Sequence, residues 1–177
     1  MISIREPNKT MLAKVVSGGQ TGADRAGLIA AKAVGFETGG FIPKGFLALD
    51  GYHPDFASLY GMEETVEATY PPRTWENARN SDATIRIATK WDSSGERLTL
   101  QAIKKYKRPH FDITAFDYIP VETVADWIIF HKVSTLNIAG NSEKTCLGIQ
   151  KWSTEYLIEL FTKIWHESRS LPRTACH

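Results

Sequence analysis

The chain has 177 residues, of which 42% are hydrophobic and 23% are charged, and its formal net charge is +1. This length suits one domain with a sizeable core, and the composition is that of an ordinary soluble globular protein. A net charge so close to zero gives no basic field that would attract nucleic acid or a membrane surface. We therefore expect neither nucleic acid nor a membrane among the partners.

Targeting and redox signals are absent from the sequence. No apolar run approaches the roughly 20 residues of a membrane span, and residues 1–10 contain no apolar stretch of the kind found in signal peptides. The two cysteines, Cys146 and Cys176, do not make a disulfide framework. We therefore expect a cytoplasmic protein with reduced thiols.

The chain is organised around a glycine-rich turn between a predicted strand and a predicted helix. Lys14–Ser17 predicts a buried parallel strand, and Asp24–Val34 predicts a helix that Gly35 ends. The turn between them consists of Gly18, Gly19, Gln20, Thr21 and Gly22. A helix start leaves backbone N–H groups without internal partners, and its dipole favours negative charge. We predict a phosphate or nucleotide site here, with Asp24 and Arg25 beside the ligand; the alternative is a plain tight turn.

The rest of the chain alternates predicted strands and helices. Strands are expected at Phe36–Pro43, Asp82–Thr89, Pro109–Thr114 and Leu136–Ala139, and helices at Arg73–Asn80, Arg97–Tyr106, Val121–Val133 and Leu147–His166. Phe46–Tyr60 is expected to be irregular, and Gly61–Tyr70 to hold a short extended segment. Such alternation predicts an α/β fold: one doubly wound, mostly parallel sheet with helices on both faces.

The predicted domain organisation is simple. A flexible N-terminal arm is expected at residues 1–12, the nucleotide-binding domain at residues 13–166, and a flexible tail at residues 167–177. In a doubly wound fold, ligands bind outside the carboxyl ends of the strands, where the strand order reverses. The loops 18–22, 93–96 and 140–144 follow strands or begin helices, so we expect them to converge on one site.

Other side chains extend this prediction. Arg73, Thr74 and Asn77 share one face of a predicted helix, and Asp82 begins the next strand. They form either a second wall, with Arg73 on a phosphate and Asn77 or Asp82 on a ribose or base, or a surface helix followed by a capping aspartate. Lys44 either adds a point charge or is solvated. The full predicted ligand-binding set is Gly18, Gly19, Gln20, Thr21, Gly22, Asp24, Arg25, Lys44, Arg73, Thr74, Asn77, Gly95, Thr99, Gly140, Asn141, Ser142, Glu143 and Lys144.

Several other chemistries find little support. The five histidines and two cysteines lack metal-ligand spacing, so no metal site is expected. There is no GxSxG nucleophile elbow. Cys146 follows a polar loop near a predicted helix start, where its thiol is either activated or a bystander. We interpret His131 as a core or capping histidine, facing inward from its helix.

The motifs together carry a family resemblance. Residues 17–26 (SGGQTGADRA) resemble the opening motif of the putative molybdenum carrier family, also described as a circularly permuted YpsA-like branch of the SLOG Rossmann-like superfamily. Further matches follow in order over residues 13–165. They are residues 39–45, Asp50-Gly51, Arg73-Thr74 with Asn77, residues 81–84, residues 136–140 with 142–144, and Gly148-Ile149.

This resemblance implies a Rossmann-like fold, a nucleotide-like ligand at the strand ends and self-association into a homo-oligomer. The family name implies a link to the molybdenum cofactor, so the ligand would be a phosphorylated nucleotide or a molybdopterin-type molecule. Relatives in the superfamily include phosphoribohydrolases, which cleave the base from a nucleoside monophosphate, and sensors of nucleotide-derived signals. Both remain as alternatives to a carrier, and whether the protein is an enzyme is left open.

One departure from the resembled pattern concerns Glu96, which stands where a small hydroxyl residue is expected after the Asp82–Thr89 strand. A carboxylate beside bound phosphate is repulsive unless Arg97 neutralises it. The same carboxyl is a candidate general acid or base. If the protein is a hydrolase, the catalytic candidates are Glu96, Asp82, Asp24 and Glu143.

Overall fold

The computed structural model describes residues 12–169, so residues 1–11 of the predicted arm and residues 170–177 of the predicted tail lie outside them. The strands are β1 Lys14–Ser17, β2 Glu37–Ile42, β3 Leu47–Ala48, β4 Gly51–Tyr52, β5 Met62–Glu64, β6 Ala83–Ala88, β7 His110–Thr114 and β8 Thr135–Gly140. The helices are α1 Ala23–Val34, α2 Phe56–Tyr60, α3 Tyr70–Arg79, α4 Ser94–Tyr106, α5 Val121–Phe130 and α6 Ile149–Arg169.

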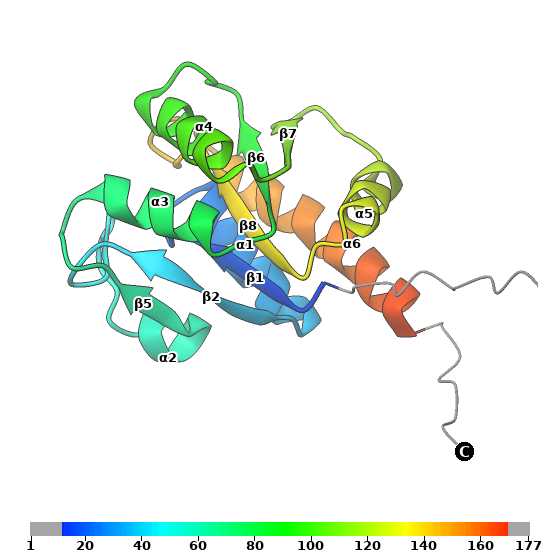
Figure 1. Ribbon diagram of the computed structural model, residues 1–177, viewed down its shortest axis with the longest axis horizontal. Helices are drawn as coiled ribbons and strands as arrows, with labels where there is room; N and C mark the ends of the chain where they lie inside the picture. The colour runs from blue at the N-terminus through cyan, green and yellow to red at the C-terminus, as the bar shows by residue number, and fades with distance from the viewer. Residues whose placement is uncertain (1–11, 170–177) are drawn as a thin grey trace, which may run out of the picture.

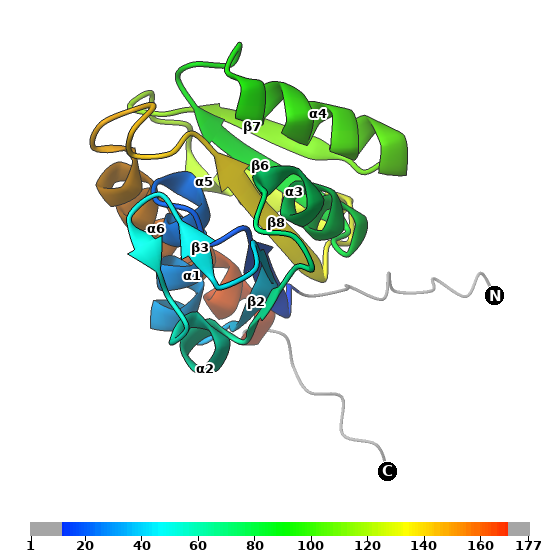
Figure 2. The same ribbon diagram turned by 90° about the vertical axis from the view of Figure 1, so that its left-hand side faces the viewer.

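Six strands form one sheet in the order β5-β2-β1-β8-β6-β7, and every pairing in it is parallel. Helices α3 and α4 cover one face, while α1, α5 and α6 cover the other (Figure 1). Figure 2 shows the sheet between these two layers. The predicted doubly wound α/β fold is confirmed.

The main core lies under α1, α5 and α6. The spacing of Leu157, Leu160, Phe161 and Ile164 places them on one side of α6, and all four are buried. Gly27 allows helix α1 to lie close to the sheet, because any side chain at this position would overlap Ile138 of β8. Strand β8 lies in the middle of the sheet, between β1 and β6.

The expectation of an irregular segment at Phe46–Tyr60 is wrong. The segment forms the β3–β4 hairpin and helix α2, and Gly61 beyond it leads into edge strand β5. Phe56 and Tyr60, one helical turn apart, are buried in a second core with Leu28, Ile42 and Met62. The extended segment expected within Gly61–Tyr70 is confirmed as β5.

Several helix boundaries differ from expectation; α5, for example, ends at Phe130, before the expected Val133. Helix α3 starts at Tyr70 because two prolines are accommodated in its first turn. Helix α4 starts at Ser94, before the predicted Arg97, because the Ser93 hydroxyl accepts a hydrogen bond from Glu96 N–H and caps it. Helix α6 continues to Arg169, three residues into the predicted tail.

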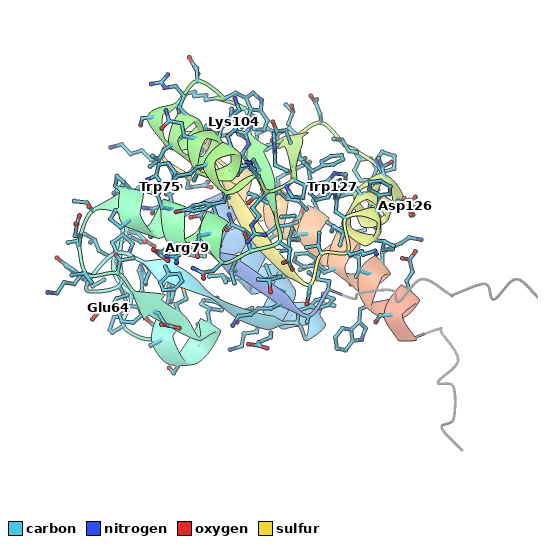
Figure 3. The ribbon with its side chains drawn as sticks, in the orientation of Figure 1. Glu64, Trp75, Arg79, Lys104, Asp126 and Trp127 are labelled. Carbon is cyan, nitrogen blue, oxygen red and sulfur yellow. The ribbon has the colours of Figure 1, made fainter. Side chains whose placement is uncertain are left out.

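Two ring side chains, Trp75 and His131, lie near the surface, and His131 was expected to face inward. Trp75 of α3 is half-buried and packs against the ring of Tyr106, on the same outer layer as Lys104 of α4 (Figure 3). His131 is exposed and caps the end of α5, donating its backbone N–H to Trp127. The capping interpretation of His131 therefore holds, and the core interpretation is wrong.

Candidate functional site

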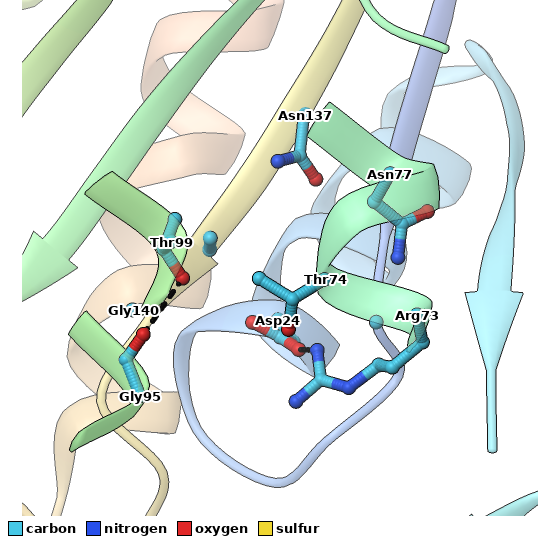
Figure 4. A pocket seen from close by; sticks show the side chains of 10 residues that line it. Asp24, Arg73, Thr74, Asn77, Gly95, Thr99, Asn137 and Gly140 are labelled. Atoms are coloured by element: carbon cyan, nitrogen blue, oxygen red, sulfur yellow. Dashed lines mark hydrogen bonds and ion pairs between the residues drawn. The ribbon is translucent and has the colours of Figure 1, made fainter. Parts of the chain in front are cut away.

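A cavity opens between α3 and α4 at the carboxyl ends of β1, β6 and β8, and we call it the interhelix cavity. Its outer part has a volume of about 390 Å³ and its inner part about 50 Å³. Both parts are lined by Arg73, Thr74, Gly95 and Gly140. Figure 4 shows Arg73 and Thr74 on α3 facing Gly95 and Thr99 on α4 across this space.

The predicted convergence of three loops is confirmed. Gly18 and Gln20 after β1, Ser93–Glu96 at the start of α4, and Gly140–Ser142 after β8 all line the interhelix cavity. They meet because parallel strands end at the same edge of the sheet. The three loops therefore meet at one edge of the sheet, where the start of α4 contributes more residues to the cavity lining than the turn after β1 does.

The glycines of the first loop make room for protein atoms. A Cβ at Gly18 would overlap the guanidinium of Arg73, and one at Gly22 would overlap the backbone of Asn141 and Ser142. Gly22 also has φ 92°, a conformation that favours glycine. These glycines are required because neighbouring protein atoms pack against them. The sequence prediction had expected a phosphate in that space.

The first backbone N–H groups of α1 also have protein partners. Gly22 N–H donates to Gln150 Oε1 at 2.9 Å, and Ala23 N–H donates to the Asn141 carbonyl at 3.1 Å. Gln20 Oε1 accepts from the N–H groups of Thr21 and Leu49, which ties the β3–β4 hairpin to this loop. An anion at the start of α1 would compete with these contacts.

Arg25 does not face the interhelix cavity. Its guanidinium forms two bonds to the carboxylate of Asp50, at 2.5 and 2.9 Å, and a third to the Gly19 carbonyl. The bonds from Arg25 hold the pKa of Asp50 well below its usual range. Arg25 therefore fixes the hairpin to α1, and Thr21 lies beside it in a separate surface hollow.

Arg73 and Asp24 form a buried ion pair at the inner end of the interhelix cavity. Arg73 Nη1 lies 2.6 Å from Asp24 Oδ2, and Asp24 is 3% exposed (Figure 4). Burial raises the pKa of Asp24, while the charge and hydrogen bond of Arg73 oppose that rise. Arg73 Nε is buried and has no hydrogen-bond partner among residues 12–169. The guanidinium therefore retains donor capacity at the cavity wall.

The start of α4 faces Arg73 from the opposite wall. Helix geometry leaves the N–H groups of Ser94 and Gly95 without intrahelical partners. A Cβ at Gly95 would meet nothing within 4 Å, so the space beside Gly95 is open. The predicted Gly95 and Thr99 both line the cavity, and the Thr99 hydroxyl donates to the Gly95 carbonyl. This helix start has the open backbone donors that the start of α1 lacks.

Glu96 lies in the first turn of α4 with its carboxyl group buried. Its Oε1 is 3.5 Å from Asn141 Nδ2, its Oε2 is 3.6 Å from Arg86 Nη1, and the residue is 2% exposed. Oε2 has no hydrogen-bond donor within the described part of the chain. Burial raises the pKa of Glu96 to about 7, with Asp24 and Asp112 adding to the rise and Arg86 opposing it. The expected partner Arg97 instead binds the Asp92 carbonyl.

Arg86 is the charged residue near the site that the sequence prediction missed. It is 5% exposed, forms two bonds to Asp112 of β7, and lies over the ring of Trp91. The sequence signal that could have identified Arg86 is a charged residue in the middle of the apolar stretch Ala83–Ala88. Asn137 of β8 was also missed; it lines the inner cavity and donates to Thr84.

The side chains of the loop after β8 form hydrogen bonds with neighbouring segments of the protein. Asn141 Oδ1 accepts from the N–H groups of Thr89 and Lys90, which joins this loop to the end of β6. Glu143 accepts from the N–H groups of Gly148 and Gln150 at the start of α6. The carboxylate of Glu143 therefore stabilises α6, away from the interhelix cavity. Lys144 is exposed and does not line the cavity.

Three further predicted residues are placed elsewhere or engaged in the fold. Asn77 borders the inner cavity, but its amide binds both the N–H and the carbonyl of Phe41, which fixes β2. Lys44 is exposed and outside the cavity lining. Asp82 lies at the amino end of β6, where it accepts from the N–H groups of Ser134 and Thr135. Asp82 is therefore at the wrong edge of the sheet for catalysis in this cavity.

Metal and thiol chemistry gain no structural support in the described residues. Within residues 12–169, no group of three or more histidine, cysteine, aspartate or glutamate side chains is placed to hold a metal ion. Cys146 is half-buried and accepts a bond from the Thr89 hydroxyl. Across the same residues, none of the helices combines the length and apolar character needed to cross a membrane.

The fold and the cavity define a class: a Rossmann-like α/β domain with a polar cleft at the carboxyl ends of its strands. Residues 15–161 match the model of the circularly permutated YpsA SLOG family, and the chain belongs to that family. The family resemblance inferred from the sequence is confirmed.

One solved structure supports the assignment. It is the crystal structure of a putative molybdenum carrier protein from Syntrophus aciditrophicus, which is 35% identical with a TM-score of 0.76. The match covers 86% of this chain and 96% of that chain. None of the curated proteins compared with this chain matches it.

Proposed function

We propose that this protein binds a small phosphorylated ligand, a nucleotide or a molybdopterin-type molecule, in the interhelix cavity. The observation that carries the proposal is the guanidinium of Arg73, which lies at the wall of the cavity with its Nε unpartnered within the described residues. Arginine binds phosphate through several donors held in a planar fork. A half-buried arginine with an unused donor beside a cavity therefore favours an anionic ligand.

The two walls of the cavity suit a phosphate group. Arg73 provides positive charge on the α3 side, and the start of α4, with the backbone N–H groups of Ser94 and Gly95, lies on the other side. A helix N-terminus favours anions through these N–H groups and through its dipole. Tyr70, Pro71 and Leu98 line the outer part and provide apolar surface for the remainder of the ligand.

The carrier role is supported by the family and by the structural neighbour, whose name describes it as a putative molybdenum carrier protein. A carrier needs to hold its ligand without transforming it. The cavity offers positioning groups and backbone donors, which is sufficient for that task. We therefore propose a carrier or storage role ahead of an enzymatic one.

Native mass spectrometry of freshly purified protein tests this role. A complex that releases a nucleotide or pterin on denaturation supports a carrier and identifies the ligand class, and the same spectrum measures the proposed self-association. Protein purified without ligand is then titrated with AMP and with molybdate by calorimetry. An empty protein that binds neither anion contradicts the proposal.

A second candidate, hydrolysis of a nucleoside monophosphate, is favoured by the two carboxyls with raised pKa values, Asp24 and Glu96. One ionised carboxylate would take a proton from water as the water oxygen bonds to the ribose C1′. The C1′–N bond would break, and the base would leave with a proton from solvent or a second acid. The products would be the free base and ribose 5-phosphate.

Chromatography of AMP incubated with the protein tests this second candidate. Release of adenine that stops in Glu96→Gln, while AMP binding persists, supports it. If wild-type protein binds AMP but releases no adenine, the hydrolase candidate is contradicted and the carrier role is supported.

A further inference from the structure

We propose that this protein takes up a proton together with its anionic ligand, and that Glu96 is the carboxyl group that receives it. This inference rests on the proposed anion site in the interhelix cavity. It adds a property that the fold and the family do not supply: the strength of binding depends on the protonation state of one buried side chain.

The position of Glu96 brings its charge into conflict with a bound anion. Glu96 lies in the first turn of α4, next to Ser94 and Gly95, whose N–H groups form one wall of the proposed site. An ionised carboxylate there would repel a phosphate at short range. Because the carboxyl is 2% exposed, water provides little screening of that repulsion.

The cations around Glu96 are already engaged. Arg86 approaches it at 3.6 Å from β6 but forms two bonds to Asp112 of β7. Arg73, across the cavity on α3, is paired with Asp24 of α1. The charged groups that act on Glu96 are therefore Arg86, Asp24 and Asp112, so the one arginine beside Glu96 is shared with Asp112 and is not left to neutralise a ligand as well.

The local hydrogen bonding suits the neutral acid. Glu96 Oε2 is buried and lacks a hydrogen-bond donor among the described residues, whereas Oε1 accepts a long bond from Asn141. Burying an ionised oxygen without a donor is unfavourable, and protonation removes that cost. The pKa of Glu96, which burial raises to about 7, places both forms within reach near neutral pH. A bound anion would raise this pKa further.

Calorimetric titration with AMP measures the coupling directly. At pH 7.5, in buffers of different ionisation enthalpy, we expect uptake of up to about three quarters of a proton by wild-type protein, since a group with a pKa near 7 is mostly ionised there. We also expect AMP affinity to fall by up to about tenfold per pH unit above pH 7, because one proton is linked to binding.

Glu96→Gln should remove the part of the proton uptake and of the pH dependence that belongs to this carboxyl. The proton chemistry of AMP itself is common to both proteins, so their difference isolates Glu96. The matched control is Glu122→Gln, which makes the same change in the first turn of α5 at an exposed position outside the cavity. That variant should keep the wild-type uptake and pH profile.

The outcomes separate this inference from the proposed function. Binding of AMP to wild-type protein with no buffer dependence and a flat pH profile overturns the proton coupling and leaves the anion site intact. Equal proton uptake in wild type and Glu96→Gln overturns the assignment to Glu96. Absence of binding of AMP, and of molybdate in a parallel titration, overturns the anion site and this inference with it.

Discussion

Two helix starts lie at the same edge of the sheet, and they differ in what occupies their backbone donors. At α1, Gly22 N–H and Ala23 N–H bind Gln150 and Asn141, and the glycines before it accommodate neighbouring protein atoms. At α4, Gly95 borders open space in the interhelix cavity. The start of α1 has the glycine-rich sequence, but the start of α4 has the accessible geometry. Glycines in a loop therefore indicate that other atoms lie close to the backbone, but they do not distinguish ligand atoms from protein atoms.

The largest effect is expected from breaking the ion pair between Arg73 of α3 and Asp24 at the start of α1. Arg73→Met should leave Asp24 buried without its partner and lower the free energy of unfolding by about 3–5 kcal/mol. Chemical denaturation measures this change. The double variant Asp24→Asn/Arg73→Met should recover part of the stability but should not recover AMP binding. Recovery of both would show that Arg73 acts only through the fold.

Replacing one glycine at each helix start by valine sharpens the comparison between α1 and α4. Gly22→Val should destabilise the domain by about 3–4 kcal/mol, because its side chain would overlap the Asn141–Ser142 backbone at a positive φ. Gly95→Val should fold normally and weaken anion binding, since its side chain would project beside the donors of α4. Thermal unfolding and calorimetry measure the two effects. Similar stability losses in both variants would contradict the difference between the two helix starts.

Stability should also depend on pH through Glu96. The folded state retains the Glu96 proton up to a pKa of about 7, whereas the unfolded chain releases it near 4.5. Between these values the folded state binds more protons, so stability falls as the pH rises, by about 3 kcal/mol from this group. Glu96→Gln should therefore be more stable than wild type at pH 8 and similar to it at pH 4. A constant difference across this range would contradict the raised pKa.

The smallest effect is expected at the opposite edge of the sheet. Asp82→Ala should lower the free energy of unfolding by about 1–3 kcal/mol, because two N–H groups lose their acceptor. AMP affinity should remain unchanged in calorimetric titration. A loss of affinity without a loss of stability would restore Asp82 as a ligand-binding residue.

The sequence predicted the fold well where local signals and packing agree. Strands β1, β6, β7 and β8 begin and end within one residue of expectation, because each is a short apolar or alternating run. The start of α4 was missed because the capping pair Ser93 and Glu96 was interpreted as a loop. The α2 segment was missed because Phe56 and Tyr60 are explained only by the partners they meet in space.

The interhelix cavity lies at the sheet edge where the sequence predicted a ligand site, but several of the predicted residues have other partners. Arg25, Asn77 and Glu143 have the side-chain chemistry of ligand-binding residues, yet each is engaged by hydrogen bonds within the protein. Those partners are distant in the sequence or depend on the conformation of a loop. Arg86 was overlooked because a charge inside a buried strand is explained only by its contacts with Asp112 and Glu96.

The most direct test of the account is the position of a heavy tetrahedral oxyanion in crystals of the protein soaked in tungstate. An anomalous difference map is expected to show a peak between the guanidinium of Arg73 and the N–H groups of Ser94 and Gly95. A peak at the start of α1, beside Thr21 and Gly22, with the interhelix cavity empty, would contradict the assignment of the anion site to α4.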